Sequence, residues 1–200
     1  VRGVDSETIF DQWNEGIDNA CEIECVIALD ISGSMSGLKA TNSYRAMFAI
    51  KRGLSKINAN CSVITFHDEA NILYRASDKV SGGLRSAGTG GGTIPNHAIQ
   101  YATKLLAESE KAVKIFFVIT DGEWYSFDDN KETHELIERM NRSGVLTAFA
   151  YIPESGEEVK LTPESMHQCE VGAVINNPFD LLSMARVITK YAIARRLVNR

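Results

Sequence analysis

The sequence predicts an α/β domain built on a mostly parallel central sheet with helices on both faces. Apolar stretches of strand length alternate with stretches whose apolar residues recur every three or four positions. Oxygen-bearing residues follow directly after two of the most apolar stretches. Strands that alternate with helices indicate β-α-β units, whose sheet is covered on both sides. We therefore expect a three-layer, doubly wound, Rossmann-like arrangement.

Length and composition suit one globular domain. The chain has 200 residues, of which 44% are hydrophobic and 24% are charged, a balance that favours an ordinary core over disorder. The net charge of −5 argues against nucleic acid as a partner. No apolar run approaches the ~18 residues of a membrane span, and no secretory signal is recognisable. We expect a cytoplasmic protein without a nucleic-acid or membrane partner.

In the first half of the chain, the apolar patterns predict four elements and then a loop. The four elements are a strand at 22–29, a helix at 38–57, and short strands at 61–66 and 71–75. The four-residue link between the last two suits an antiparallel pair, which gives the sheet one antiparallel edge strand. A glycine-rich loop from Ser81 to Gly92 follows, and Pro95 marks the first turn of the next helix. Residues 1–20 are expected to be an N-terminal extension with a short helix, which leaves 21–200 as the domain.

The second half begins with the most apolar stretch, residues 113–119 (VKIFFVI), which predicts a buried strand. A D-x-x-E pattern at Asp129 and Glu132 predicts the start of a helix. The remaining expected elements are a strand at 145–152, a last strand at 171–175 and a C-terminal helix from about Phe179.

The four cysteines are Cys21, Cys25, Cys61 and Cys169. A C-x-x-x-C pair with two distant cysteines is not a good zinc signature. Disulfides remain an alternative, but in an intracellular chain buried free thiols are the expectation.

The first group of candidate ligands is Asp30-Ile31-Ser32-Gly33-Ser34, directly after the first strand. Side chains at every second position of an extended loop can point to one side. A carboxylate with two hydroxyls suits Mg²⁺, Mn²⁺ or Ca²⁺ better than Zn²⁺. The same residues also fit an ordinary turn before a helix, in which a serine is the N-cap.

The second and third groups are equally ambiguous when taken alone. Thr93 follows two glycines just before a helix, where a threonine is usually a cap. Asp121 follows the strand at 113–119 and precedes a glycine, as many turn residues do. Ligands of a doubly wound sheet bind beyond the carboxyl ends of its strands, where the strand order switches. All three groups are expected at that edge, and together they indicate one metal site.

These residues resemble the metal-ion-dependent adhesion site (MIDAS) of the von Willebrand factor A (vWA) domain family, whose pattern is D-x-S-x-S, a loop Thr and a strand-end Asp. The matches are Asp30, Ser32, Ser34, Thr93 and Asp121, and the resemblance covers roughly residues 20–195. It implies the vWA fold, with the serines directly on the metal and the threonine joining in ligand-bound states. It also implies aspartates that act partly through water and an open position for a partner's Asp or Glu. The implied ion is Mg²⁺ or Mn²⁺, and Ca²⁺ also fits.

The compact form and the third motif, T-D-G-E, look more like intracellular members than integrins. The metal-binding domain of cobalt and magnesium chelatase subunits is similar. Relatives of that kind work beside ring-shaped AAA+ ATPases, so the resemblance implies such a partner. Trp124 and Tyr125 follow the third motif and are candidates for an aromatic contact surface beside the metal. The alternative is two rings at the edge of the core.

A Mg²⁺-dependent phosphatase or phosphotransferase is the second hypothesis. Asp30, at a strand end near hydroxyls and a metal, would be its nucleophile. Enzymes that resemble haloacid dehalogenases place a second Asp, the general acid, where this chain has Ser32. Because a serine cannot fill that role, we favour a binding module and assign no catalytic residue.

Overall fold

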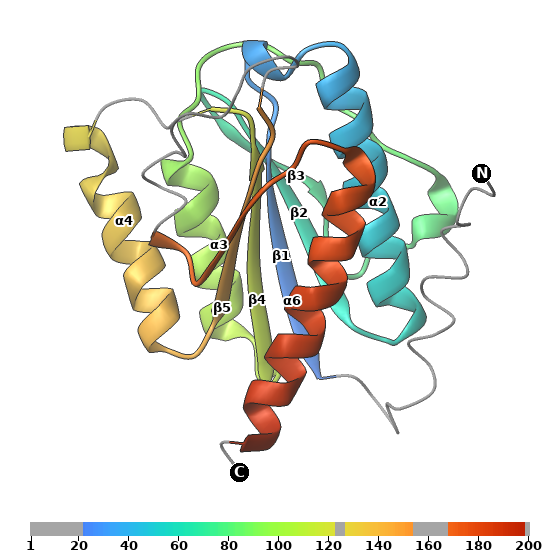
Figure 1. Ribbon diagram of the computed structural model, residues 1–200, viewed down its shortest axis with the longest axis vertical. Helices are drawn as coiled ribbons and strands as arrows, with labels where there is room; N and C mark the ends of the chain where they lie inside the picture. Colours follow the sequence, from blue (N-terminus) through green and yellow to red (C-terminus); the bar gives the residue numbers. More distant parts are fainter. Residues whose placement is uncertain (1–21, 123–126, 154–167, 199–200) are drawn as a thin grey trace.

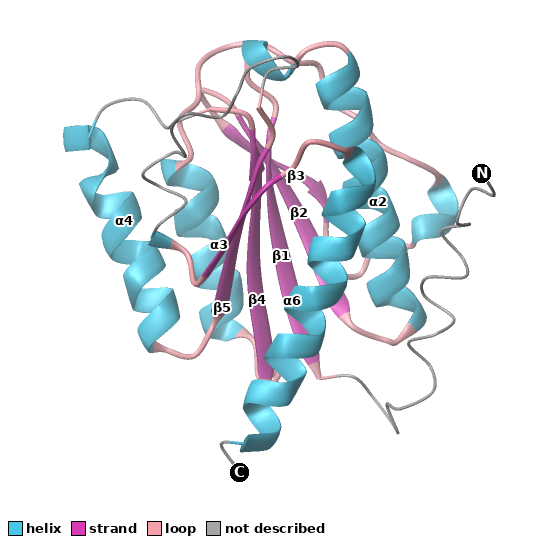
Figure 2. Ribbon diagram, viewed as in Figure 1, coloured by secondary structure: helices cyan, strands magenta, loops and turns pink. Residues whose placement is uncertain are grey.

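The computed structural model describes residues 22–122, 127–153 and 168–198. Six strands form one sheet in the order β3-β2-β1-β4-β5-β6, and helices cover both of its faces (Figure 1 and Figure 2). Neighbouring strands pair in parallel except for β2 with β3, which is antiparallel. The expected three-layer, mostly parallel sheet with one antiparallel edge strand is therefore confirmed. The expected extension at residues 1–20 lies outside the described residues.

The strands are β1 (Ile23–Asp30), β2 (Asn60–Phe66), β3 (Ala70–Tyr74), β4 (Val113–Thr120), β5 (Leu146–Tyr151) and β6 (Val171–Val174). The helices are α2 (Leu38–Lys56), α3 (Asn96–Glu108), α4 (Phe127–Arg142) and α6 (Pro178–Val198), with 3-10 turns η1 (Gly33–Met35) and η2 (Val80–Gly82). The expected start of the helix at Asp129 was wrong. The structure begins this helix, α4, at Phe127. Acidic residues are favoured throughout the first turn of a helix, so Asp129 does not fix which residue begins it.

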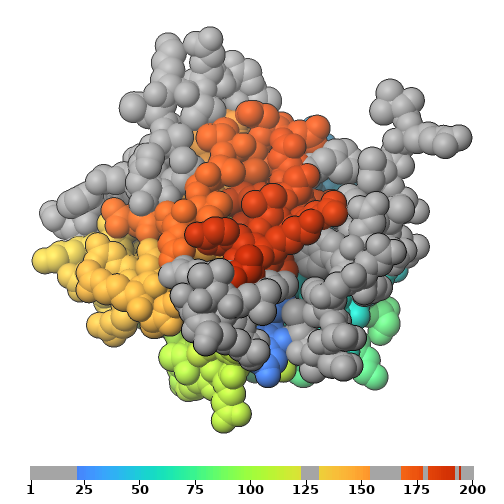
Figure 3. All heavy atoms as spheres, turned by 60° about the horizontal axis from the view of Figure 1, so that its bottom comes forward, coloured from blue at the N-terminus to red at the C-terminus, as the bar shows by residue number. Residues whose placement is uncertain are grey.

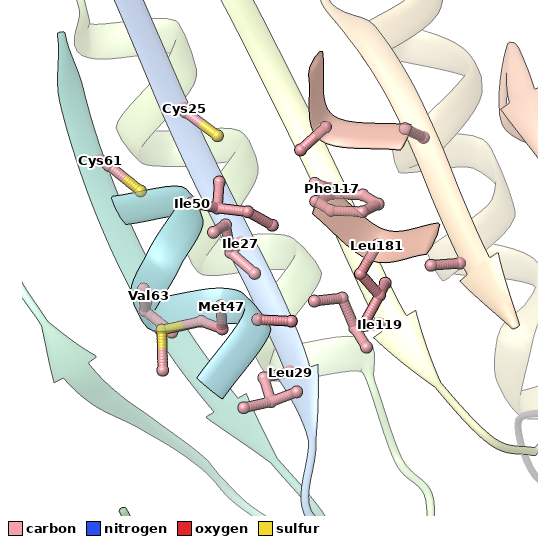
Figure 4. Close-up of a cluster of buried hydrophobic side chains, with 14 of the residues drawn as sticks. Cys25, Ile27, Leu29, Met47, Ile50, Cys61, Val63, Phe117, Ile119 and Leu181 are labelled. Carbon is pink, nitrogen blue, oxygen red and sulfur yellow. The ribbon is translucent and has the colours of Figure 1, made fainter. Parts of the chain in front are cut away.

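The central strands bury side chains on both faces, so they are apolar throughout. On β4, Phe117 packs in the cluster that includes residues of α2 and α6, whereas Phe116 packs in the cluster with α3 and α4. Figure 1 shows these two helix pairs on opposite sides of the sheet, and Figure 4 shows the first cluster. Successive side chains of one strand thus pack in two separate cores, one on each face of the sheet.

Three of the cysteines are buried free thiols, as expected, and Cys21 lies outside the described residues. Cys25 and Cys61 are register partners on β1 and β2, and both side chains lie in the cluster of Figure 4. The hydrogen bond to Cys61 and burial raise the pKa of the Cys25 thiol well above its usual value. Burial raises the pKa of Cys169 to about 12. The thiols of Cys25 and Cys169 therefore stay protonated at neutral pH.

The end of the molecule opposite the carboxyl ends of the parallel strands comes forward in Figure 3, where α6 lies at the surface in orange to red. Val187 and Tyr191 of α6 are exposed. In the described part of the chain, no helix combines the length and apolarity that a membrane crossing requires.

The strand order switches between β1 and β4, which pair in parallel at the centre of the sheet. After β1 the chain enters α2 on one face, and after β4 it reaches α4 on the other face. The helices that follow these two adjacent strands therefore lie on opposite faces, and the carboxyl ends of the strands lie at the top of Figure 1. The switch point therefore lies at the edge of the sheet where the sequence predicts a site.

The two cores can be tested independently. We expect Phe116→Ala and Phe117→Ala each to lower the free energy of unfolding by ~3–5 kcal/mol, because each removes a fully buried ring from a different face. Val187→Ala, at a side chain that is 62% exposed, is the control and should change it by less than about 0.5 kcal/mol. Urea denaturation measures all three. A phenylalanine variant as stable as the control would show that its face of the sheet is not a packed core.

Candidate metal centre

Asp30 is the last residue of β1, and its side chain joins the ends of the two central strands. It is 1% exposed. Its Oδ1 accepts a hydrogen bond from the backbone N–H of Ser32 at 2.8 Å. Its Oδ2 accepts a short hydrogen bond from the hydroxyl of Thr120, the last residue of β4. Both carboxylate oxygens are thus held by residues of the two adjacent strand ends.

A chain of polar contacts continues from this carboxylate to the loop after β4. The hydroxyls of Ser32 and Ser34 lie 3.1 Å apart. The Ser34 hydroxyl donates to Asp121 Oδ1 at 2.8 Å, and Lys39 Nζ donates to Asp121 Oδ2 at 2.5 Å. Four of the five predicted ligands are therefore connected, from Asp30 to Asp121, across the switch point of the sheet.

The glycine-rich loop that carries Thr93 is fastened to the first loop by two backbone hydrogen bonds. The N–H of Gly33 donates to the carbonyl of Gly91 at 3.2 Å, and the N–H of Gly90 donates to the carbonyl of Ile31 at 2.9 Å. Thr93 itself is 6% exposed. The structure therefore holds Thr93 on a segment that is bonded to the D-x-S-x-S loop.

Asp68, in the link between β2 and β3, also holds the glycine-rich loop. Its Oδ1 accepts the N–H of Gly92 at 2.8 Å. Gly91 has a φ of 72°, and a Cβ atom built there would lie 2.3 Å from Asp68 Oδ2. The N–H of Ile94 donates to the carbonyl of His67 at 3.0 Å. Glycine suits position 91 because other residues rarely adopt this positive φ, and a side chain there would also displace the carboxylate of Asp68.

The donor set fits a hard divalent cation. It combines two carboxylates with three hydroxyls, which are the oxygen ligands that Mg²⁺, Mn²⁺ and Ca²⁺ accept. Among residues 22–122, 127–153 and 168–198, no group of three or more His, Cys, Asp or Glu side chains is placed to hold a metal. Burial raises the pKa of Asp30, although hydrogen bonds from Thr120 and Ser32 oppose the shift. A nearby cation would offset the cost of that buried carboxylate.

Sequence reasoning gave no role in this centre to three residues that shape it: Asp68, Lys39 and Thr120, the last of which belongs to the third motif. Lys39 had a signal, because a lysine in the first turn of a helix opposes the helix dipole and so indicates an anionic neighbour. Asp68 had none, since its role depends on the loop that folds over it. Trp124 and Tyr125, the expected aromatic surface, lie outside the described residues.

Residues 25–123 match a family model described as the von Willebrand factor type A domain. This range contains all five predicted ligands, from Asp30 to Asp121. No curated protein matches the chain.

Solved structures share the fold. An aerotolerance-related membrane protein from Bacteroides fragilis aligns with a TM-score of 0.63 and 18% identity, over 86% of this chain and 99% of that chain. The SpRpn10 VWA domain aligns with a TM-score of 0.61 and 15% identity, over 82% and 95%. Proximal thread matrix protein 1 from the mussel byssus, described with a zinc-occupied MIDAS motif, gives 0.61 and 17%, over 88% and 47%. This chain spans about half the length of that last protein. At these identities the likeness shows the fold, and it confirms the expected vWA architecture.

The raised pKa of Asp30 predicts how its amide variant behaves without metal. Because the folded-state pKa lies above the usual value of an aspartate, the ionised carboxylate destabilises the metal-free fold once the pH rises above that usual value. Asp30→Asn removes this charge, so in chelator at pH 7 it should melt at or above the temperature of the wild type. Mg²⁺ should raise the melting temperature of the wild type modestly, by mass action, and should not raise that of Asp30→Asn.

Thermal melts followed by circular dichroism, with and without chelator, measure both effects. Glu138→Gln, at an exposed carboxylate on α4, is the control and should respond to Mg²⁺ like the wild type. If Asp30→Asn melts well below the wild type in chelator, the carboxylate is stabilising and the argument from burial is wrong.

Proposed function

Because this chain carries a von Willebrand factor type A domain, we propose that it binds another protein through a divalent metal. The family is one of metal-dependent protein-interaction modules. The observation that carries the proposal is the hydrogen-bonded chain across the ends of β1 and β4. The proposed ligands are Asp30, Ser32, Ser34, Thr93 and Asp121. Their oxygen chemistry favours Mg²⁺ or Mn²⁺, and Ca²⁺ also fits.

The metal, when bound, supplies positive charge and an open coordination position for an oxygen of the partner. The hydroxyls of Ser32, Ser34 and Thr93 are neutral ligands, so they leave the charge of the ion unchanged. Asp30 is held through both oxygens by Ser32 and Thr120, which supports a role partly through water. We propose that the partner supplies an Asp or Glu, because a carboxylate is attracted to a centre that keeps net positive charge.

Two exposed apolar side chains next to the motifs support a protein as the partner. Leu38, at the start of α2, is 79% exposed, and Ile94, which follows Thr93, is 40% exposed. Apolar side chains beside a polar site are typical of protein interfaces, where they bury area around a charged contact. On the chelatase-like resemblance, we propose an AAA+ ATPase as the class of partner.

We further propose a cytoplasmic location, which the three free buried thiols support.

The geometry disfavours the alternative enzyme. A nucleophilic Asp30 would need an oxygen that faces its substrate, yet both oxygens accept hydrogen bonds and the residue is 1% exposed. Ser32 stands where a general acid would be needed, and its hydroxyl contacts Ser34. We therefore propose a module without catalysis of its own.

Metal binding is tested by titration calorimetry with Mn²⁺. We expect Asp30→Ala and Asp121→Ala each to lose measurable binding, because each removes one of the two carboxylates of the centre. Glu138→Gln should bind like the wild type, since this carboxylate pairs with Arg142 on the surface of α4. Unchanged Mn²⁺ affinity in Asp30→Ala would rule out the site as proposed.

Partner binding is tested by affinity capture of the native partner with Mg²⁺ and with chelator, followed by mass spectrometry. We expect the captured partner to be lost in chelator and in Thr93→Ala, which removes the hydroxyl proposed to join the metal in the bound state. Capture that persists in chelator would contradict the proposal. Hydrolysis of p-nitrophenyl phosphate with Mg²⁺ should stay at background; turnover that Asp30→Asn abolishes would favour the enzyme instead.

A further inference from the structure

The segment that leads into the glycine-rich loop exposes most of its side chains. Residues 81–89 are all exposed except Ala87, which is half-buried against the core cluster of α2 and α6. The connection between β3 and α3 spans residues 75–95 and contains only the short turn η2, and connections so long are usually functional or disordered. Because few apolar contacts hold residues 81–89, their position depends on polar contacts.

Two tyrosine hydroxyls supply such contacts. The hydroxyl of Tyr44 donates to the carbonyl of Ala87 at 3.1 Å and accepts the N–H of Ala87 at 3.0 Å. The hydroxyl of Tyr74 donates to the carbonyl of Gly83 at 3.0 Å and accepts the N–H of Arg85 at 2.5 Å. Because a phenolic hydroxyl is both a donor and an acceptor, each one pairs with the backbone as a neighbouring strand would.

Both tyrosines belong to the rigid part of the fold. Tyr74, the last residue of β3, is 1% exposed, and Tyr44, on α2, is 4% exposed. The D-x-S-x-S loop continues through η1 into α2, so Ser34 and Tyr44 lie on one continuous stretch of chain. This stretch thus carries the two proposed serine ligands and, within the first two turns of α2, the side chain that holds the segment before Thr93.

The backbone between Ala87 and Thr93 has little stiffness of its own. It contains four glycines: Gly88, Gly90, Gly91 and Gly92. Glycine loses more conformational freedom on ordering than any other residue, so each anchor on either side of these glycines lowers the cost of placing Thr93. The hydroxyl of Tyr44 is the anchor at Ala87, on the N-terminal side of all four.

We propose that Tyr44 and Tyr74 are positioning residues for Thr93: their hydroxyls hold the glycine-rich loop where Thr93 can join the ion as a partner's carboxylate binds. The inference rests on the proposed function, and it names residues that act on that site through the backbone. In that function, Thr93 joins the ion only in the bound state. The two hydroxyls therefore favour the binding of the carboxylate and leave the affinity for the ion itself unchanged.

The first test compares two affinities in Tyr44→Phe, which loses the hydroxyl and keeps the ring. Calorimetry measures the affinity for Mn²⁺, which should stay within about twofold of the wild type. At saturating Mn²⁺, water-proton relaxation measures how acetate displaces water from the bound ion. Acetate should bind roughly fivefold more weakly, which is the net contribution of about one hydrogen bond. A merely structural role would not separate the two affinities, because damage to the centre weakens both.

The second test asks whether Tyr44 acts through Thr93. Thr93→Ala should itself weaken the binding of acetate, and Tyr44→Phe should then produce no further loss in the double variant. Residues that act independently give additive changes, whereas residues that act through one another do not. An additive loss in the double variant would overturn the proposal.

Hydrogen exchange in chelator tests the contact without metal. The N–H of Ala87 should exchange at least roughly fivefold faster in Tyr44→Phe, because it loses the oxygen that accepts its hydrogen bond. Amides within α3 serve as the internal reference and should exchange as in the wild type. Unchanged exchange at Ala87 would show that the hydroxyl does not hold the segment.

Tyr74→Phe is the second variant and should weaken acetate binding in the same direction, which keeps the proposal testable if Tyr44→Phe does not fold. Tyr191→Phe, at a side chain that is 53% exposed on α6, is the control and should match the wild type throughout. Unchanged acetate affinity in both variants, or a parallel loss of Mn²⁺ affinity, would overturn the proposal.

These results are distinct from a failure of the proposed function. If Mn²⁺ binding is lost in Asp30→Ala but the tyrosine variants behave like the wild type, the metal site stands and the positioning role falls. Absence of Mn²⁺ binding in the wild type, or of any displacement of water by acetate, overturns both.

Discussion

The parallel pairing of β1 with β4 is the constraint on which the rest of the structure depends. It sets the last residues of two apolar strands side by side, and Thr120 then donates to Asp30 across that pair. The helices that follow these strands pack on opposite faces, and polar side chains gather at the carboxyl ends of the two strands. The same two strands supply both buried cores, so the core that stabilises the fold also fixes the spacing of the site.

Charge is distributed unevenly over this site. Asp121 has the hydroxyl of Ser34 on one oxygen and the ammonium of Lys39 on the other. Asp30 has only neutral donors, and its pKa is raised by burial. The metal-free centre therefore holds one carboxylate that already has a cation and one that does not. If the proposed ion binds, the buried carboxylate whose cost it would offset is that of Asp30, because Asp121 already pairs with Lys39.

The sequence predicts the fold well because the spacing of its apolar residues indicates which stretches are strands and which are helices. Residues 113–119 are apolar without interruption, which a strand covered on both faces requires. The placement of Asp30 and Asp121 at one edge follows from that parallel topology. Lys51 was not foreseen: it lies inside the apolar face of α2 and is fully buried, with its ammonium donating to the carbonyls of Cys61 and Arg75. Its burial depends on carbonyls from distant parts of the chain, and periodicity within the helix carries no information about them. The contacts of Asp68 depend in the same way on a distant loop, which the sequence around Asp68 does not indicate.

The contacts that hold the glycine-rich loop are separate from the side chains that are exposed beside it. Backbone hydrogen bonds from Gly33 and Gly90 fix the position of the loop, and the carboxylate of Asp68 lies against Gly91. Thr93 is thereby positioned by main-chain contacts that a partner does not need to touch. Leu38 and Ile94 project beside this frame and are exposed. Substitution at these two positions would alter the surface beside the proposed ligands without disturbing either core or the frame that holds those ligands.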